Sequence, residues 1–382
     1  MEITFSFILI ALSSFIIWRS TDGFELASDF LGRRLSKGIK GATINAVASS
    51  MPEFLSTIFF LFYLNDANGF SGGIGITGGS AVFNILVIPI SIYFVLYFSK
   101  GIKKIPIARV TFLRDGLILF VMTGFVAWVV NNPQLHWWHG ALLTAPYLGY
   151  LIYLFFTHKK ILGKGDNFSY NAKDKKIHFV DFAMINLEKM VLRGKTIRVT
   201  NAWWLLMASI MVMVAGTWML VYATDRLGED LGIPILFVSV ILAAAASSIP
   251  DTMISIRDAK KGNYEDAFSN ALGSNIFDIS FALGFPLLIY TLLNGAIIMD
   301  AKIIASSSDL WFGLFLITGL TILIFIIGNK FNLGKTILLT LLYLIFIGFV
   351  WADFKYHIDF VGNVVGFVKD AFGIKKLNEV FQ

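Results

Sequence analysis

Residues 46–53 read Ala-Val-Ala-Ser-Ser-Met-Pro-Glu, and residues 244–251 read Ala-Ala-Ala-Ser-Ser-Ile-Pro-Asp. A second matching pair follows, because residues 79–84 read Gly-Ser-Ala-Val-Phe-Asn and residues 273–278 read Gly-Ser-Asn-Ile-Phe-Asp. The offset between the copies is 198 residues for the first pair and 194 for the second. The chain therefore contains an internal repeat, and each copy places polar residues inside an apolar stretch.

The composition indicates that these stretches lie in a membrane. Of the 382 residues, 57% are hydrophobic and 15% are charged, whereas a soluble domain carries about 25% charged residues. Long apolar runs of about 20 residues are typical of membrane-spanning helices. Hydropathy and helix-breaking residues predict ten spans, near 3–18, 41–64, 72–98, 112–131, 138–157, 202–224, 232–256, 266–292, 310–328 and 336–352. The absence of Cys excludes disulfide frameworks and thiolate metal sites.

The order of the spans predicts an inverted repeat. Five spans precede the polar segment 158–201 and five follow it. Because five is an odd number, the second copy must cross the membrane in the opposite sense, as in secondary transporters. We therefore expect an all-α membrane protein with ten transmembrane helices in two inverted-topology five-helix repeats. The expected units are 1–157 (first motif region 41–90), a cytoplasmic linker 158–201, 202–352 (second motif region 240–288) and a tail 353–382.

Basic residues are distributed unevenly between the two sides. Alternate connections place 25 of the 31 Lys and Arg residues on one side, in 19–40, 99–114, 158–201, 257–261 and 329–335. The positive-inside rule then places both termini outside. This distribution accounts for the net charge of +6 without a nucleic-acid partner, so the expected surroundings are membrane lipid and inorganic cations.

Two polar segments have helical spacing of apolar residues. In the linker, Val180, Met184, Leu187 and Val191 form such a stripe near Lys189 and Arg193. An interfacial helix or an ordinary solvated linker would explain it. The tail leaves the same choice between a surface helix and a disordered end, and its stripe consists of Val361, Val364, Val365, Val368 and Phe372.

The acids of the two motifs are the strongest candidates for function. A charged residue in the middle of a membrane helix costs at least about 2.5 to 3.5 kcal/mol, so Glu53 and Asp251 need compensation. Pro52 and Pro250 each remove a backbone donor, which releases carbonyls near the acids. Carboxylate, carbonyl, amide and hydroxyl oxygens suit Ca²⁺, Na⁺ or K⁺, and the motifs lack the His and Cys ligands typical of zinc or copper sites.

The small and hydroxylated residues of the motifs have simpler explanations. The glycines from Gly72 to Gly79 and the alanines 243–246 could serve close helix packing. The string Gly73 to Gly78 fits G-x-G-x-x-G, but its membrane context excludes a nucleotide-binding interpretation. The serines could satisfy carbonyls of their own helices. Glu53, Asp251 and Asp278 could alternatively be neutral buried acids or form internal salt bridges.

Together the motifs resemble the two alpha repeats of the calcium/cation antiporter superfamily. The second copy, from Ser248-Ile249-Pro250-Asp251 to Asp278, is especially similar to potassium-dependent sodium/calcium exchangers. The short linker is similar to that of bacterial or archaeal members, which implies a location in the plasma (inner) membrane. The resemblance covers about 80 residues of the chain.

The resemblance implies a role for each motif residue. It assigns Ca²⁺ to the acids Glu53 and Asp251, with help from the positions of Ser49 and Ser247. It assigns a central site for K⁺ or Na⁺ to Asn84 and Asp278. Sodium sites would be lined by Ser50, Ser80, Ser248, Ser274 and the carbonyls of Ala46 and Ala244. No cofactor is implied, since Ca²⁺, Na⁺ and K⁺ would be transported ions.

The expected function is antiport of Na⁺ against Ca²⁺, with K⁺ as a further candidate ion, by alternating access. A proton-coupled calcium/cation exchanger is the nearest alternative, in which an acid alternates between protonated and metal-bound states. A more distant alternative is an intramembrane aspartyl enzyme. The Tyr-Asp and Gly-x-Gly-Asp motifs of such enzymes do not surround Asp251 or Asp278, so we expect a transporter and no enzymatic activity.

Overall fold

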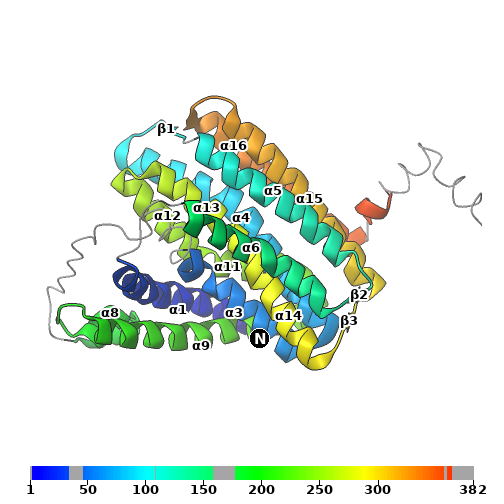
Figure 1. Cartoon of the computed structure of the whole chain (residues 1–382), viewed down its shortest axis with the longest axis horizontal. Helices are drawn as coiled ribbons and strands as arrows, with labels where there is room; N and C mark the ends of the chain where they lie inside the picture. Colours follow the sequence, from blue (N-terminus) through cyan, green and yellow to red (C-terminus); the bar gives the residue numbers. More distant parts are fainter. Residues whose placement is uncertain (1, 34–45, 108, 158–176, 357–358, 364–382) are drawn as a thin grey trace, which may run out of the picture.

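A computed structural model describes residues 2–33, 46–107, 109–157, 177–356 and 359–363 (Figure 1). The first half of the described chain contains five long helices, and the second half contains five more helical segments, two of which are subdivided. The first five are α1 (Glu2–Leu31), α3 (Ala46–Leu64), α4 (Asp66–Lys100), α5 (Arg109–Val130) and α6 (Trp137–Thr157). The others are α9 (Val199–Leu231), α10 to α12 (Ile235–Lys261), α13 to α14 (Tyr264–Asn294), α15 (Ala301–Ile326) and α16 (Leu333–Tyr356).

These ten segments correspond to the ten predicted spans. Among the described residues, nine helical segments are long and apolar enough to cross a membrane. The tenth, α6, has 21 residues and contains no Asp, Glu, Lys or Arg. The main difference is α1, which continues past the predicted end at residue 18 to Leu31. Its polar extension is stabilised because Asp22 forms ion pairs with Arg19 and Arg257.

Two small sheets show that the repeats are inverted. β1 (Lys104–Pro106, after α4) pairs with β4 (Lys330–Asn332, after α15), and β2 (Gln134–Leu135, after α5) pairs with β3 (Ile297–Ile298, after α14). The two pairs lie at opposite ends of α5 and α15. Each pair therefore joins a connection of one repeat to a connection of the other, and α5 and α15 run antiparallel. The prediction of two inverted five-helix repeats is confirmed.

Contacts also place the basic connections at one end of the bundle. The β1–β4 pair joins connection 99–114 to connection 329–335. Lys100 Nζ donates to the Lys260 carbonyl, Arg257 pairs with Asp22, and Arg19 Nε donates to the Met184 carbonyl over 2.7 Å. The described parts of all five connections that the sequence places on one side are therefore linked at the same end of the bundle, where β1, α12 and α8 lie along the left side of Figure 1.

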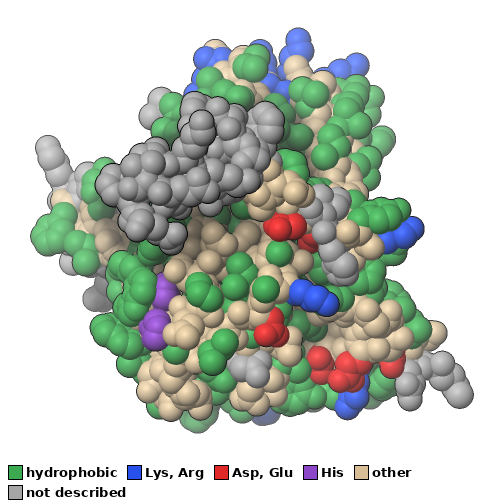
Figure 2. Space-filling view, turned by 90° about the vertical axis from the view of Figure 1, so that its right-hand side faces the viewer, with side chains coloured by type: hydrophobic (Ala, Val, Ile, Leu, Met, Phe, Trp, Pro, Cys, Tyr) green, Lys and Arg blue, Asp and Glu red, His purple; other side chains and the backbone are tan. Residues whose placement is uncertain are grey.

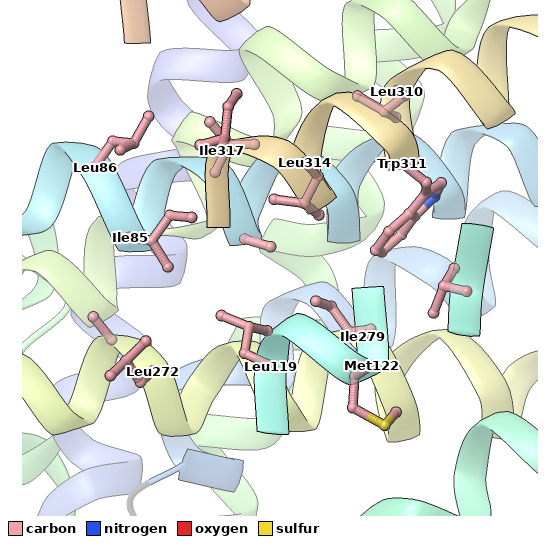
Figure 3. Close-up of a cluster of buried hydrophobic side chains, with 14 of the residues drawn as sticks. Ile85, Leu86, Leu119, Met122, Leu272, Ile279, Leu310, Trp311, Leu314 and Ile317 are labelled. Carbon is pink, nitrogen blue, oxygen red and sulfur yellow. The ribbon is translucent and has the colours of Figure 1, made fainter. Parts of the chain in front are cut away.

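The helices form a main bundle and a flanking pair. α1 packs along α9 over much of its length, and the two lie side by side at the lower left of Figure 1. The bundle is built around α4, which contacts α3, α12, α13, α15 and α16. Its apolar core includes Ile85, Leu119, Ile279 and Trp311 from four different helices (Figure 3). This arrangement buries the motif-bearing helices α3, α4, α12 and α13.

The outer surface is apolar, as expected for helices that face lipid. Exposed large side chains include Val121 and Phe156 of the first repeat and Met211 and Leu344 of the second. Figure 2 shows hydrophobic side chains spread over one end of the molecule, with charged side chains in small groups. Large apolar side chains are therefore exposed on helices of both repeats, while the polar motif residues lie inside.

The linker contains two short helices instead of the one helix that its stripe could form. α7 (Phe179–Ala183) and α8 (Leu187–Leu192) are separated by Ile185, which has a positive φ of 47°. Asp181 of α7 accepts a hydrogen bond from the His178 backbone over 2.8 Å and pairs with Lys189 of α8 over 2.9 Å. These contacts lower the pKa of Asp181. Leu187 is buried, whereas Val180 and Met184 are exposed.

The start of the tail docks onto α15. The Phe360 and Val361 backbone amides donate to the Asp309 carboxylate over 2.6 and 2.7 Å. The rest of the predicted tail stripe, Val364 to Phe372, lies outside the described residues, as does linker segment 158–176.

Candidate functional site

Four helices bring the motif residues together at one place inside the bundle. α3 carries Ser49, Ser50 and Glu53, and α4 carries Ser80 and Asn84. In the second repeat, α12 carries Asp251, α13 carries Ser274, and Asp278 follows directly at the start of η3 (Asp278–Ala282). The side chains of all these residues, and of Ser247 and Ser248, are fully buried. The structure thus brings the repeated polar residues of both motifs together at one buried place.

Three carboxylates form the centre of this site. Glu53, Asp251 and Asp278 each offer a carboxylate oxygen, and these three oxygens lie within 4.8 Å of one another. None of the three acids forms an ion pair with a Lys or Arg among the described residues. This excludes the internal salt bridge as their explanation within the part of the chain that is described. A cation would be needed to offset three negative charges in this position.

Serine hydroxyls connect the acids across the two repeats. Ser80 Oγ lies 3.2 Å from both Glu53 Oε1 and Asp278 Oδ2, either of which can accept its single proton, and 2.9 Å from Ser248 Oγ. Ser274 Oγ donates to Asp251 Oδ1 over 2.8 Å and lies 3.1 Å from Ser49 Oγ. Ser80, Ser248 and Ser274 have partners on other helices, and among the described residues their hydroxyls donate to no carbonyl of their own helix. The simpler explanation of the hydroxyls therefore fails for Ser80, Ser248 and Ser274.

Two asparagines complete the network. Asn84 Nδ2 lies 3.2 Å from Asp251 Oδ2 and 2.9 Å from Asn275 Oδ1. Asn275 Nδ2 in turn donates to the Ala81 carbonyl over 2.9 Å. Asn84 thus bonds to the acid of the opposite repeat, and Asn275 fixes the orientation of its amide.

Asn275 was missed as a site residue by the sequence reasoning. It lies in the second motif, but its counterpart in the first motif is Ala81, so a comparison of the two copies does not select it. The signal available in the sequence was an amide side chain between Ser274 and Asp278 in an apolar stretch. The structure buries this amide fully. In the structure it bonds to the carbonyl of its own counterpart.

The helix is interrupted at the motif proline in one repeat only. In the second repeat α11 (Ala244–Ser247) ends before Ser248, whose ψ of 2° departs from α-helical geometry, and α12 starts at Ile249 with Pro250 in its first turn. In the first repeat α3 runs without interruption from Ala46 to Leu64, with Pro52 inside it. A proline removes one backbone donor, and neighbouring groups can satisfy the freed carbonyl, so a helix can continue through it.

The remaining predicted ligands have different positions. Ser247 Oγ donates to the Ala244 carbonyl over 3.1 Å, which also accepts from the Ser248 amide over 3.0 Å. In this conformation the Ser247 hydroxyl therefore satisfies a carbonyl of its own helix. Ser50 is fully buried beside Ser49 on α3. Ala46 is the first residue of α3, and its side chain lies outside the described part.

The glycines of α4 serve close packing, as their simpler explanation predicts. A Cβ at Gly75 would lie 2.6 Å from the Leu236 carbonyl oxygen, and a Cβ at Gly79 would lie 2.7 Å from Ala244 Cβ. The segment that packs against these glycines of α4 includes a π-helical turn, η2 (Ser239–Ala243). A second π-helical turn, η3, begins at Asp278 itself. Such turns occur often at functional sites, and the sequence did not reveal either of them.

The chemistry of this site is that of a hard-cation ligand set. Every side chain of the site offers an oxygen atom, and Asn84 and Asn275 also carry an amide nitrogen. Three of the side chains carry a negative charge when they are ionised. The acids come from both inverted repeats and lie deep inside a membrane-spanning bundle. The fold and the site together define an integral membrane protein with a buried, oxygen-rich acidic site.

A family comparison identifies the class more closely. The model of the sodium/calcium exchanger protein family matches residues 5–156 and 201–352, which comprise both repeats. The chain belongs to this family. It is similar to human sodium/potassium/calcium exchanger 1, with 31% identity over 145 residues. That match covers 37% of this chain and 13% of the human protein.

Solved structures of ion exchangers share the fold. The H⁺/Ca²⁺ exchanger CAX superposes with a TM-score of 0.60 at 12% identity, covering 95% of this chain and 91% of that chain. The sodium-calcium exchanger NCX_Mj superposes with a TM-score of 0.52 at 22% identity, covering 91% of this chain and 98% of that chain. At these identities the likeness establishes the architecture and leaves the coupling ion open.

Proposed function

We propose that the protein is a secondary active antiporter that exchanges Na⁺ for Ca²⁺ by alternating access. One observation carries this proposal: Glu53, Asp251 and Asp278 present carboxylate oxygens within 4.8 Å of one another in a fully buried site. Membership in the sodium/calcium exchanger protein family supports it. We propose Ca²⁺ for the pair Glu53 and Asp251, which occupy equivalent positions in the two repeats.

Charge balance explains how such a site can couple two ions. Two ionised carboxylates 4.8 Å apart repel by about 3.5 kcal/mol at an effective dielectric constant of 20. An empty, fully ionised site would therefore be costly, and bound cations remove this cost. Ca²⁺ with one monovalent cation, or three Na⁺ ions, would neutralise three carboxylates. Ions of the two kinds then exclude each other, which is the requirement for exchange.

The hydroxyls support sodium as the coupling ion. Ser80, Ser248 and Ser274 contact the acids from both repeats and offer neutral oxygen ligands beside the charged ones. We propose that these serines line sodium sites, together with Ser50 and the carbonyls of Ala46 and Ala244, with Ser49 and Ser247 beside the Ca²⁺ ligands. Asn84 and Asp278 would form the central site for Na⁺ or K⁺.

Ion flux in reconstituted vesicles tests the proposal. Vesicles loaded with Na⁺ should take up Ca²⁺ when diluted into Na⁺-free buffer, and parallel series with and without K⁺ test the central site. Glu53→Gln and Asp251→Asn should abolish this uptake, whereas Glu229→Gln, which changes an acid that is 59% exposed, should not. Undiminished transport by both site variants would contradict the assignment.

The same vesicles distinguish the proton-coupled alternative. Ca²⁺ uptake driven by a pH gradient in the complete absence of Na⁺ would favour an H⁺/Ca²⁺ exchanger. Flux that is independent of any counter-ion gradient would indicate a passive channel. Either outcome would replace the sodium-coupled mechanism while leaving the cation site in place.

The proposal includes an orientation. The end that carries α7, α8 and the β1–β4 sheet would face the cytoplasm, because it gathers most of the basic residues. Both termini would then lie outside, in a bacterial or archaeal plasma (inner) membrane.

A further inference from the structure

From Asp251 in the site, α12 runs to the end of the bundle that carries most of the basic residues. Arg257 lies six residues beyond Asp251 on this helix, which corresponds to about 9 Å along the helix axis. At this level α12 meets the last third of α1, which carries Asp22 and Glu25. The contact lies between the site and the end that we assign to the cytoplasm.

Arg257 bridges two acids of α1. Its Nη2 lies 2.6 Å from Asp22 Oδ1, and its Nη1 lies 3.5 Å from Glu25 Oε2. Arg19 of α1 pairs with the other oxygen of Asp22 over 2.5 Å. The guanidinium group thus hydrogen-bonds the Asp22 carboxylate and lies within ion-pair distance of the Glu25 carboxylate, a spread-out geometry that the single ammonium group of a lysine reproduces poorly.

These ion pairs join the two parts of the fold. Among the residues that the structure describes, the remaining ion pairs lie within α1, α5, α9 or α12, or between α7 and α8. Arg257 therefore makes the described ionic connection between the α1–α9 pair and the helices that carry the site. Close to it, the contact between these parts is apolar, as between Phe24, Ala48 and Met213.

The environment of the pair allows it to break and reform. The side chain of Arg257 is 42% exposed, while that of Asp22 is 13% exposed. Water can therefore replace the partner of Arg257 when the helices separate. A fully buried pair would be too costly to open, and a fully exposed pair would contribute little to closure.

We propose that Arg257 is a positioning residue that holds α1 against the Asp251 helix and keeps the inner end of the ion pathway closed. This inference rests on the proposed function and takes the inner opening of the ion pathway to lie between α1 and α12, where Arg257 spans the contact. The ion pair is broken in the inward-open state and intact in the state described by the structure. Loss of Arg257 then shifts the population toward the inward-open state.

Cysteine labelling tests this shift independently of transport. The chain has no Cys, so single cysteines can be introduced without background. Ser255→Cys lies on α12 between Asp251 and Arg257, and Thr57→Cys lies at the equivalent position of α3, 198 residues earlier. Both native side chains are fully buried. The two cysteines therefore report on the inner and outer halves of the pathway.

In membrane vesicles of either orientation, Arg257→Gln should change the two labelling rates by an impermeant maleimide in opposite directions. The rate for Ser255→Cys from the inner side should rise by about fivefold, the effect expected of a partly exposed ion pair. The rate for Thr57→Cys from the outer side should fall. Arg257→Lys should have a smaller effect than Arg257→Gln, and Arg257→Glu a larger one.

A matched control uses an ion pair that stays within one helix. Arg226 pairs with Glu229 on α9 over 2.8 Å, so Arg226→Gln should leave both labelling rates unchanged. Unchanged rates in Arg257→Gln would overturn the inference, and so would rates that rise together, since general loosening exposes both halves. Absence of exchange by the unmodified protein would instead contradict the proposed function, which the flux assay measures separately.

Discussion

Replacement of Glu53 by glutamine tests whether the buried acids bind Ca²⁺ in equilibrium. Glu53→Gln keeps the shape of the side chain and its contacts with Ser80, but removes one of three charges that lie within 4.8 Å of one another. We expect the purified variant to lose most of the thermal stabilisation that Ca²⁺ gives the unmodified protein. Without added cations its Tm should be no lower than that of the unmodified protein.

The magnitude follows from the geometry of the site. Each neighbouring carboxylate contributes about 3.5 kcal/mol of repulsion to an ionised Glu53 at 4.8 Å, and the glutamine is free of this repulsion. Removing one charge from a buried, paired set costs about 3 to 5 kcal/mol, which weakens Ca²⁺ binding by a factor of roughly 10² or more. Ca²⁺ at 100 times Kd stabilises the folded protein by about 2.7 kcal/mol, and this falls to about 0.4 kcal/mol or less when Kd rises a hundredfold.

The assay is thermal unfolding in detergent as a function of Ca²⁺ concentration, with Glu229→Gln as the matched control. Glu229 is 59% exposed and pairs with Arg226 on α9, so its replacement should preserve the full Ca²⁺ shift. Equal Ca²⁺ shifts in Glu53→Gln and the unmodified protein would refute the reasoning. A variant that is already unfolded without cations would contradict the expected relief of repulsion.

Three further predictions concern other parts of the structure. Asn275→Leu removes the amide that bonds to the side chain of Asn84 over 2.9 Å, so the Kd for Ca²⁺ should rise by about five- to hundredfold, and an unchanged Kd in calorimetry would show that this bond is dispensable. Gly79→Ala should lower Tm and yield because its Cβ would overlap the Val240 carbonyl, whereas Gly149→Ala, with nothing within 4 Å, should not. Because the folded-state pKa of Asp181 is lowered by the His178 backbone and Lys189, its stabilisation of the α7–α8 contact should persist above the ordinary Asp titration near pH 4 and disappear as pH falls below it. Hydrogen exchange of 178–192 would measure this, and equal protection at low and neutral pH would argue against it.

Much of the fold could be predicted because it depends on local composition. Apolar runs determine which segments enter the membrane, and an odd number of spans per repeat determines that the copies are inverted. The length of α1 could not be predicted in this way, because its polar part from Arg19 to Leu31 reads as a loop until Arg257 is available as a partner for Asp22. An interaction between residues 235 positions apart leaves no local pattern in the sequence.

The candidate site shows the same division. The sequence by itself determined the oxygen chemistry of the site and its principal acids. Glu53 and Asp251 occupy equivalent positions beside prolines in the two motif copies, and Asp278 occupies the position equivalent to Asn84. Tertiary structure alone decided which side chains meet: it brought Ser80 to both Glu53 and Asp278, and it made Asn275 a bridge to Asn84. These contacts depend on the rotation and depth of each helix against its neighbours, which close packing at Gly75 and Gly79 fixes. A repeat in the sequence specifies which residues are equivalent, whereas the packing of the helices specifies which of them touch.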